Sequence, residues 1–382
     1  QSAWLEKHIE WHLLGNHLFA NAKALVFAGL FFEGRAAKRW LSKGLEILQR
    51  EIPEQILDDG GQFELSPMYH LIATEDVLDL VNAAKAWPGL VDKDVVEHWK
   101  QTARKMLEWA SVMRHPDGQI ALFNDSAFGI APEPDEIFSY AERLGIEFEP
   151  PSGALQHLEH SGYVRADVGD AVLFADVGRI GPDYLPGHAH ADTLAFELSL
   201  YDERWLVDTG CSTYEVCDER LRQRGTAAHN TVIVDSEDSS EVWSSFRVAR
   251  RARPLDVKSE VASDAVAISA AHDGYKRLKG RVIHERVFKL QSGELVISDE
   301  LDGDFNSAEA NLLLHPDVEV REGDSSVILT RNDREAEIQF DGDQFGVYPA
   351  TWHPEFGLSI PTHRITVAFT RSMLTTTIRW GN

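Results

Sequence analysis

Hydrophobic residues in the first third of the chain recur at the spacing of a helix. Leu14, Leu18 and Leu25 belong to a run in which apolar side chains return every three or four positions, so they would line one face of a helix. Turn-forming residues interrupt this pattern at Gly34, Pro53, Asp58–Gly61 and Pro88–Gly89. Because glycine and proline end helices, residues 1 to 112 are predicted to form four or five helices of about 12 to 25 residues.

The pattern changes twice in the rest of the chain. Residues 113 to 162 are rich in proline, glycine and aspartate, which indicates a linker holding one more helix from Asp135 to Leu144. After Tyr163, short apolar or alternating runs are separated by glycine, aspartate and asparagine, as is typical of antiparallel strands. The predicted strands are Ala171–Ala175, Leu194–Leu200, Trp205–Val207, Thr231–Val234, Val282–Leu290, Glu294–Ile297, Ala310–Leu314, Ser326–Leu329 and Ile365–Phe369.

These patterns predict an α+β protein of two domains. Residues 1–160 have the paired helices of an α/α toroid or solenoid, although no repeat of fixed period is visible. Residues 161–382 have the strands and turns of an antiparallel β-sandwich. A length of 382 residues is also more typical of two domains than of one.

Charge excludes some classes of partner. The chain has 62 acidic and 37 basic residues and a formal net charge of −25. Nucleic acids and anionic membranes need a basic surface, so neither is expected as a partner. A local basic cleft could still attract a polyanion, because salt screens charges beyond about 8 Å. The arginines available for such a cleft are Arg220, Arg222, Arg224, Arg247, Arg250 and Arg251.

Other features of the sequence bear on its compartment. No apolar run reaches the roughly 18 residues of a membrane span. The two cysteines, Cys211 and Cys217, allow one disulfide bond or none, and they leave the redox compartment open. The chain begins without methionine and without the basic and apolar regions of a signal peptide, so we interpret it as a processed or truncated product.

Two imidazoles and one carboxylate suggest a metal site in the second half. His190, Asp208 and His229 each follow or precede a predicted strand, where ligands can converge, and this set of ligands suits Zn²⁺. Their spacing carries no local signature, so the alternative is that they are hydrogen-bonded polar groups at sheet edges. His188, His190 and Asp192 would share one face if the following strand began that early.

Candidates for acid–base chemistry occur in both halves of the chain. His188 could give or take a proton near neutral pH, although a lone histidine is more often structural. Asn16 and His17 lie at the start of an apolar helix, and Tyr69 follows Pro67, which suits a first helical turn. The alternatives are that Asn16 caps its helix and that Tyr69 is a core aromatic residue with its hydroxyl at the rim.

Taken together, these motifs resemble the heparinase II/III-like polysaccharide lyases, and especially the heparinase III type of polysaccharide lyase family 12. The segments Gly15–Leu18, Asp59–His70 and Gly187–Asp192 occur in the family's order, and Phe196–Leu198 follows them. Gln62–His70, which contains Gln-Phe-Glu-Leu-Ser-Pro, is the most specific of these. The resemblance covers most of the chain and implies an α/α toroid followed by an antiparallel β-sandwich.

The resemblance also implies a reaction and roles for these residues. Members of the family cleave a glycosidic bond 4-linked to a uronic acid by β-elimination, which leaves an unsaturated uronate. Asn16 matches the residue that neutralises the carboxylate, with His17 as a helper. Tyr69 matches the residue that protonates the leaving oxygen, and His188 matches the family's histidine base or partner; either of the two takes the C5 proton. The expected substrate is therefore an acidic, heparan sulfate-like polysaccharide.

A structural zinc ion is implied as well. Relatives of the heparinase II type bind zinc through a histidine two positions after the catalytic histidine, then an aspartate and a second histidine. His190, Asp208 and His229 stand in the matching places. The ion would hold the loop that carries His188 rather than act as a Lewis acid.

Several alternatives remain open at the level of sequence. The glycan could instead be alginate or a bacterial exopolysaccharide, or the protein could bind or assemble glycans without turnover. The family normally has more helices before the Asn-His helix, so this chain either lacks the first part of a larger toroid or is a short form. A periplasmic or secreted location is expected, with the cytoplasm as the alternative.

Overall fold

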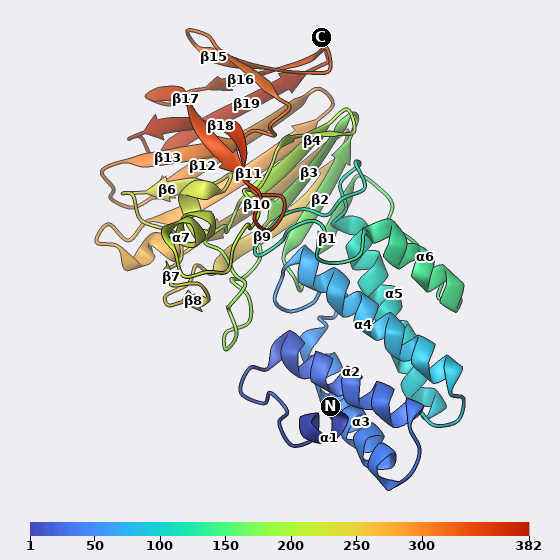
Figure 1. Ribbon diagram of the computed structural model, residues 1–382. Helices are drawn as coiled ribbons and strands as arrows, with labels where there is room; N and C mark the ends of the chain where they lie inside the picture. Colours follow the sequence, from blue (N-terminus) through green and yellow to red (C-terminus); the bar gives the residue numbers. More distant parts are fainter. Residues whose placement is uncertain (382) are drawn as a thin grey trace.

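The computed structural model describes residues 1–381 and consists of a helical part followed by a region of antiparallel sheets (Figure 1). This order confirms the fold class expected from the sequence. The helices are α1 (Ser2–Leu5), α2 (Gly15–Phe31), α3 (Arg35–Gln55), α4 (Pro67–Ala86), α5 (Lys93–Val112), α6 (Pro134–Leu144) and α7 (Asp218–Arg224), with 3₁₀ turns η1 (Thr226–Ala228) and η2 (Gly274–Arg277).

Local capping residues set several helix boundaries. Ser66 accepts a hydrogen bond from the backbone N–H of Tyr69, which starts α4, and Asp92 does the same for α5. A capping box of Glu133 and Glu136 starts α6, which confirms the helix predicted in the linker. The break predicted at Pro53 is wrong, because α3 continues to Gln55. Proline removes one hydrogen bond there, and packing of the helix's buried face outweighs that loss near the end of the helix.

The helices share one apolar core. Helix α2 packs on α3 and α4, and α4 packs on α5 and α6. Leu18, Leu25, Leu71, Leu78 and Leu107 are among the fully buried side chains of this core. Within the described residues, each helix is too short or too polar to cross a lipid bilayer.

Residues 155–380 form four sheets. The five-stranded sheet has the order β1 (Leu155–Leu158), β2 (Tyr163–Val168), β3 (Ala171–Asp176), β4 (Phe196–Leu200) and β5 (Glu203–Leu206). The eight-stranded sheet has the order β14 (Glu319–Glu322), β15 (Ser326–Arg331), β16 (Arg334–Phe340), β19 (Met373–Trp380), β12 (Glu294–Asp302), β11 (Ile283–Gln291), β10 (Ala265–His272) and β9 (Pro254–Ala262). The four-stranded sheet is β17 (Gln344–Trp352), β18 (Ile360–Phe369), β13 (Ala308–Leu313) and β6 (Val232–Val234), and β7 (Val242–Trp243) pairs with β8 (Arg247–Val248).

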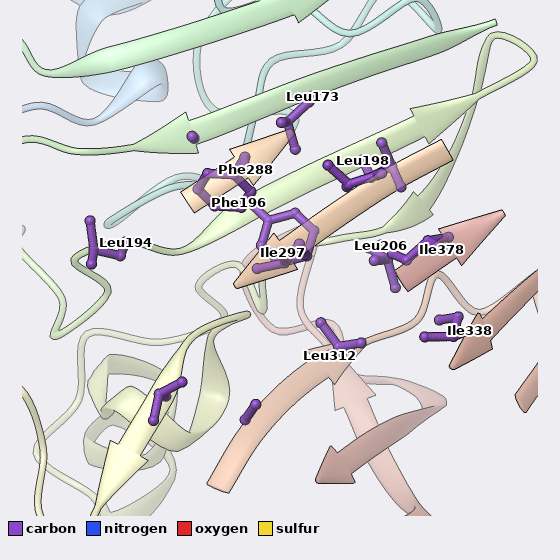
Figure 2. Close-up of a cluster of buried hydrophobic side chains, with 14 of the residues drawn as sticks. Leu173, Leu194, Phe196, Leu198, Leu206, Phe288, Ile297, Leu312, Ile338 and Ile378 are labelled. Carbon is purple, nitrogen blue, oxygen red and sulfur yellow. The ribbon is translucent and has the colours of Figure 1, made fainter. Parts of the chain in front are cut away.

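The sheets enclose a second apolar core. Side chains of β4 face those of β11 and β12 in Figure 2, and the rings of Phe196 and Phe288 lie 5.5 Å apart in an edge-to-face arrangement. Every strand predicted from the sequence overlaps a strand of the structure. The other strands were not predicted, namely β1, β2, β7–β10, β14, β16, β17 and β19. Of these, β9 is a largely exposed edge strand and β10 is rich in alanine, so their apolar pattern is weak.

The segment between β3 and β4 is a long loop rather than an early strand. Strand β4 begins at Phe196, so His188, His190 and Asp192 do not share a strand face, contrary to the prediction. The loop hangs from the sheets toward the helices, where Tyr184 donates a hydrogen bond to Glu54 of α3 (Figure 1). Helix α6 ends at Leu144 and β1 begins at Leu155; a domain division at residue 160 remains a prediction.

Candidate active site and metal centre

Of the four residues predicted to act in catalysis, the other three lie near Tyr69. A cavity of about 260 Å³ between α2 and α4 is lined by Asn16, His17 and Tyr69, together with Gln55 and other residues. The imidazole of His188 packs against the Tyr69 ring, with 4.1 Å between ring centroids. The helical part and the β3–β4 loop therefore contribute to one site.

Asn16 is placed with its amide open to a ligand. It is the second residue of α2 and half-buried, and the residue at the cap position is Leu14, so Asn16 does not cap the helix. Among residues 1–381, none forms a hydrogen bond with its side-chain amide. His17 is more exposed, at 55% of its side chain, and its Nδ1 lies 3.6 Å from Glu10 Oε2.

The Tyr69 hydroxyl is held in its protonated form. Tyr69 lies on the first turn of α4, and its hydroxyl accepts a hydrogen bond of 3.3 Å from the Tyr214 hydroxyl. Burial raises the pKa of Tyr69 to about 12, and the nearby carboxylates of Asp125 and Glu64 act in the same direction. At neutral pH this side chain can donate a proton, and it is a poor base.

His188 sits between two carboxylates. Its Nδ1 lies 2.9 Å from Asp125 Oδ2, and its Nε2 lies 3.4 Å from Glu64 Oε2. Only 14% of its side chain is exposed. The Asp125 bond orients the ring so that Nε2 faces Glu64 and the ring face meets Tyr69.

Asp125 connects the catalytic and metal candidates. Besides His188, its carboxylate bonds His190 Nε2 at 2.8 Å and forms a paired contact with the Arg220 guanidinium, of which Nη2–Oδ2 is 2.7 Å. Although burial opposes ionisation, Arg220 and the two histidines hold the pKa of Asp125 well below its usual range. One buried carboxylate therefore fixes both histidines of the loop.

Sequence reasoning missed Asp125 and Tyr214, and it considered Arg220 only for a basic cleft. The segment Asn124–Ser126 has turn-forming residues and was assigned to the linker. The side chains of Asn124, Asp125 and Ser126 are nevertheless all buried. Buried polar residues inside a turn-like segment carry no periodic signal, so only their burial reveals them. Glu64 belongs to the most specific motif and was given no role.

Three buried atoms that have no hydrogen-bond partner among residues 1–381 mark a candidate metal centre. They are His190 Nδ1, His229 Nε2 and Asp192 Oδ1, and the ligand atoms of these three residues lie within 4.8 Å of one another. His190 donates from Nε2 to Asp125 and His229 donates from Nδ1 to Asp208, which leaves each of the other ring nitrogens as a free acceptor. Two imidazoles and a carboxylate fit Zn²⁺.

Asp208, the carboxylate of the predicted ligand set, is not a member of this group of three. Asp208 Oδ2 lies 2.7 Å from His229 Nδ1, so its carboxylate orients that histidine and Asp192 faces the shared centre instead. Burial raises the pKa of Asp192 to about 6, and the neighbouring Asp208 acts in the same direction. Burial also raises the pKa of Asp208, since the attraction of His229 does not fully offset it.

The backbone is strained around the site. Leu14, Leu65, Asn124 and Leu194 have positive φ angles of 59°, 63°, 57° and 68°. Such conformations cost non-glycine residues about 1–3 kcal/mol each and persist where surrounding contacts impose them. Asn124 shows one such set of contacts, because its side chain donates to Leu65 O and accepts from the backbone N–H of His190.

Comparison with known proteins identifies the family. The model of the heparinase II/III N-terminus matches residues 1–132, and the heparinase II/III-like C-terminal model matches residues 150–381. The chain belongs to the heparinase II/III family. As a member of this family, it has the fold of a solved heparinase III, with a TM-score of 0.83 and 19% identity over 100% of this chain and 63% of that one.

Curated relatives are longer than this heparinase II/III chain. A heparin-sulfate lyase of Bacteroides stercoris is 27% identical over 79% of this chain and 45% of its own length. One of Bacteroides thetaiotaomicron is 24% identical over 88% of this chain and 49% of its own length. The chain thus spans about half the length of the curated relatives it matches.

Proposed function

We propose that this protein is a polysaccharide lyase that cleaves an acidic, heparan sulfate-like glycan by β-elimination. The observation that supports this most strongly is that Asn16 of α2 and Tyr69 of α4 line one cavity, and that His188 of the β3–β4 loop packs against the Tyr69 ring at 4.1 Å. The heparin-sulfate lyase names of the curated relatives favour the same substrate class.

The geometry supports distinct roles for the three residues. The free amide of Asn16 donates to the uronate carboxylate, where negative charge grows as the C5 proton leaves; an oxyanion donor of this kind contributes about 3–4 kcal/mol. His188, oriented by Asp125, accepts the C5 proton. Tyr69, whose high pKa keeps its hydroxyl protonated, gives a proton to the departing O4. The electron pair of the C5–H bond forms the C4–C5 double bond, and the electron pair of the C4–O4 bond leaves with the oxygen that Tyr69 protonates.

A substrate panel tests this proposal. The full-length protein should convert heparan sulfate to products with the ultraviolet absorbance of an unsaturated uronate, and it should be slower on desulfated chains. Alginate and bacterial exopolysaccharides are tested in parallel. If only one of these reacts, that glycan replaces heparan sulfate as the proposed substrate. Glycan binding without unsaturated product in any arm would contradict the lyase and favour a non-catalytic role.

We also propose that His190, Asp192 and His229 hold a structural zinc ion, with Asp208 and Asp125 orienting the two imidazoles. The three buried atoms that lack partners support this assignment. When bound, zinc supplies a positive charge that offsets the buried carboxylate of Asp192. The three ligand residues would join the β3–β4 loop, which carries His188, to the segment that follows η1.

Metal removal should weaken the fold. Purified protein is expected to contain about one zinc per chain, and chelation should lower the melting temperature by about 5 °C or more. His190→Ala should lose the metal, whereas His157→Ala, which removes a histidine bonded to Ser259, should keep it. A metal-free sample as stable as the untreated protein would contradict this site.

A further inference from the structure

The start of the loop between β3 and β4 does not line the cavity of Asn16 and Tyr69. A hollow of about 610 Å³ opens there between residues 179–183 of the loop and residues 249–255, which precede and begin β9. We call it the arginine hollow, because its lining includes Arg179, Arg250, Arg251 and Arg253. Two acidic residues, Asp183 and Asp273, also line the hollow.

The charge of this hollow runs against that of the whole chain. Four guanidinium groups face the two lining carboxylates and Glu241, which pairs with Arg250, whereas the chain has 37 basic and 62 acidic residues. Salt screens the more distant acidic residues beyond about 8 Å, so an anion in the hollow would experience mainly these arginines. The six arginines suggested by sequence do not form one cleft, because Arg220 and Arg224 are buried and bonded inside the protein.

Two of the four arginines are committed to the protein. Arg250 pairs with Glu241, with Nε–Oε2 at 2.7 Å, and Arg251 donates to the backbone oxygens of Pro182 and Asp183. Arg251 thereby ties the loop to the segment before β9. These bonds give the hollow a defined wall.

The other two arginines have free guanidinium groups. Arg179 and Arg253 are exposed, and among residues 1–381 neither side chain has a hydrogen bond or ion pair. A planar guanidinium presents a fork of donors that matches sulfate and carboxylate groups. Two free forks on the wall of one hollow are suited to an anionic chain with charges at intervals.

Two segments connect this hollow to the candidate active site. Residues 179–183 line the hollow, and the same loop reaches His188 five residues later. From the other side, Phe246 lies 6.0 Å from His188 between ring centroids, and three residues later the chain begins to line the hollow. A polysaccharide held at Tyr69 and His188 that continues along this loop would reach the arginines.

We infer that the arginine hollow is an additional subsite for sulfate or carboxylate groups of the acidic polysaccharide, away from the bond that is cleaved, with Arg179 and Arg253 as its ligands. The choice of an acidic polysaccharide as the ligand of this subsite rests on the proposed lyase function. The subsite engages long chains and leaves short ones untouched, because a short oligosaccharide in the active site does not extend past the loop.

Binding and kinetics of Arg179→Ala/Arg253→Ala test the subsite. KM for long heparan sulfate chains should rise about five- to tenfold, since each exposed charge pair contributes modestly, while KM for tetrasaccharides stays unchanged. The matched control is Lys93→Ala/Arg321→Ala, which removes two exposed cations at the start of α5 and on β14 at the opposite edge of the eight-stranded sheet from β9. The control should leave both KM values unchanged.

A binding measurement separates this inference from the lyase proposal. Calorimetric titration with long heparan sulfate, at several salt concentrations, requires no turnover; the arginine variant should bind more weakly and with a smaller dependence on salt than the wild type. Equal affinity of variant and wild type would overturn the subsite even if the protein is a lyase. An oligonucleotide serves as a second polyanion in the same titration. If the arginine variant binds the oligonucleotide more weakly but binds heparan sulfate as the wild type does, the subsite is overturned too. Absence of unsaturated product in wild type would contradict the lyase and leave this titration informative.

Discussion

Replacing Tyr69 by phenylalanine should lower kcat on heparan sulfate about a thousandfold while the protein remains folded. The substitution removes the hydroxyl that would protonate the leaving oxygen and keeps the ring that packs against His188. Initial rates of unsaturated product formation, together with the melting temperature of each variant, measure the effect.

Tyr140→Phe is the matched control for this change. Tyr140 also lies on a helix, donates a hydrogen bond of 2.7 Å to Asp79, and has its pKa raised to about 12 by burial and this contact. It lies on α6 and does not line the cavity of Asn16 and Tyr69, so its kcat should match the wild type. A Tyr69→Phe variant with wild-type kcat would contradict the acid role.

The pH dependence of kcat distinguishes the acid role of Tyr69 from a base role. Because burial raises its pKa to about 12, an acid is already fully protonated and kcat should stay level from about pH 7 to 10 with respect to this group. A tyrosinate base would instead become more abundant, and kcat would rise about tenfold per pH unit over that range.

Asp125→Leu should destabilise the protein by about 3–5 kcal/mol and abolish activity. The substitution leaves the buried Arg220 guanidinium without its counter-charge, which is the most costly way to break a buried ion pair. It also removes the carboxylate that orients His188 and His190. Urea unfolding gives the change in free energy, and product formation and zinc content report on the two histidines.

Two further variants separate these effects of Asp125. Asp125→Leu/Arg220→Met removes both charges and should recover most of the stability without recovering activity. Asp117→Leu breaks a similar arginine pair, with Arg204 Nε 2.6 Å from Asp117 Oδ2, at a carboxylate that is 34% exposed. It should cost less stability than Asp125→Leu and leave activity intact, because the buried Arg204 keeps Glu197 Oε2 as a second counter-charge at 3.3 Å. Full activity of Asp125→Leu/Arg220→Met would contradict the role of Asp125 in positioning.

Much of the local structure could be predicted from the sequence. Helical spacing of leucines and the Ser66-Pro67 start of α4 are short-range signals, so the predicted helices and the place of Tyr69 in a first turn were confirmed. Weakly patterned strands such as β9 escaped, since an exposed edge strand needs few apolar residues. The pairing of β19 between β12 and β16 joins distant segments and leaves no local signal.

The residue types of the site were determined by the sequence, and their relations by the tertiary structure. The motifs, through the family resemblance that they carry, pointed to Asn16, Tyr69 and His188 and to the metal candidates His190 and His229. Tertiary packing decided that Asn16 and Tyr69 line one cavity and that the His188 ring of the β3–β4 loop packs against Tyr69. It also turned Asp192, rather than Asp208, toward the two histidines.

The role of Asp125 shows why this division arises. Backbone geometry acts over a few residues, so it leaves periodic patterns and caps that can be seen in a sequence. Hydrogen bonding of a buried carboxylate depends on which groups packing brings within about 3 Å, whatever their separation in the chain. Asp125 meets His188, His190 and Arg220 from 63 to 95 residues away, and only the folded chain brings them together.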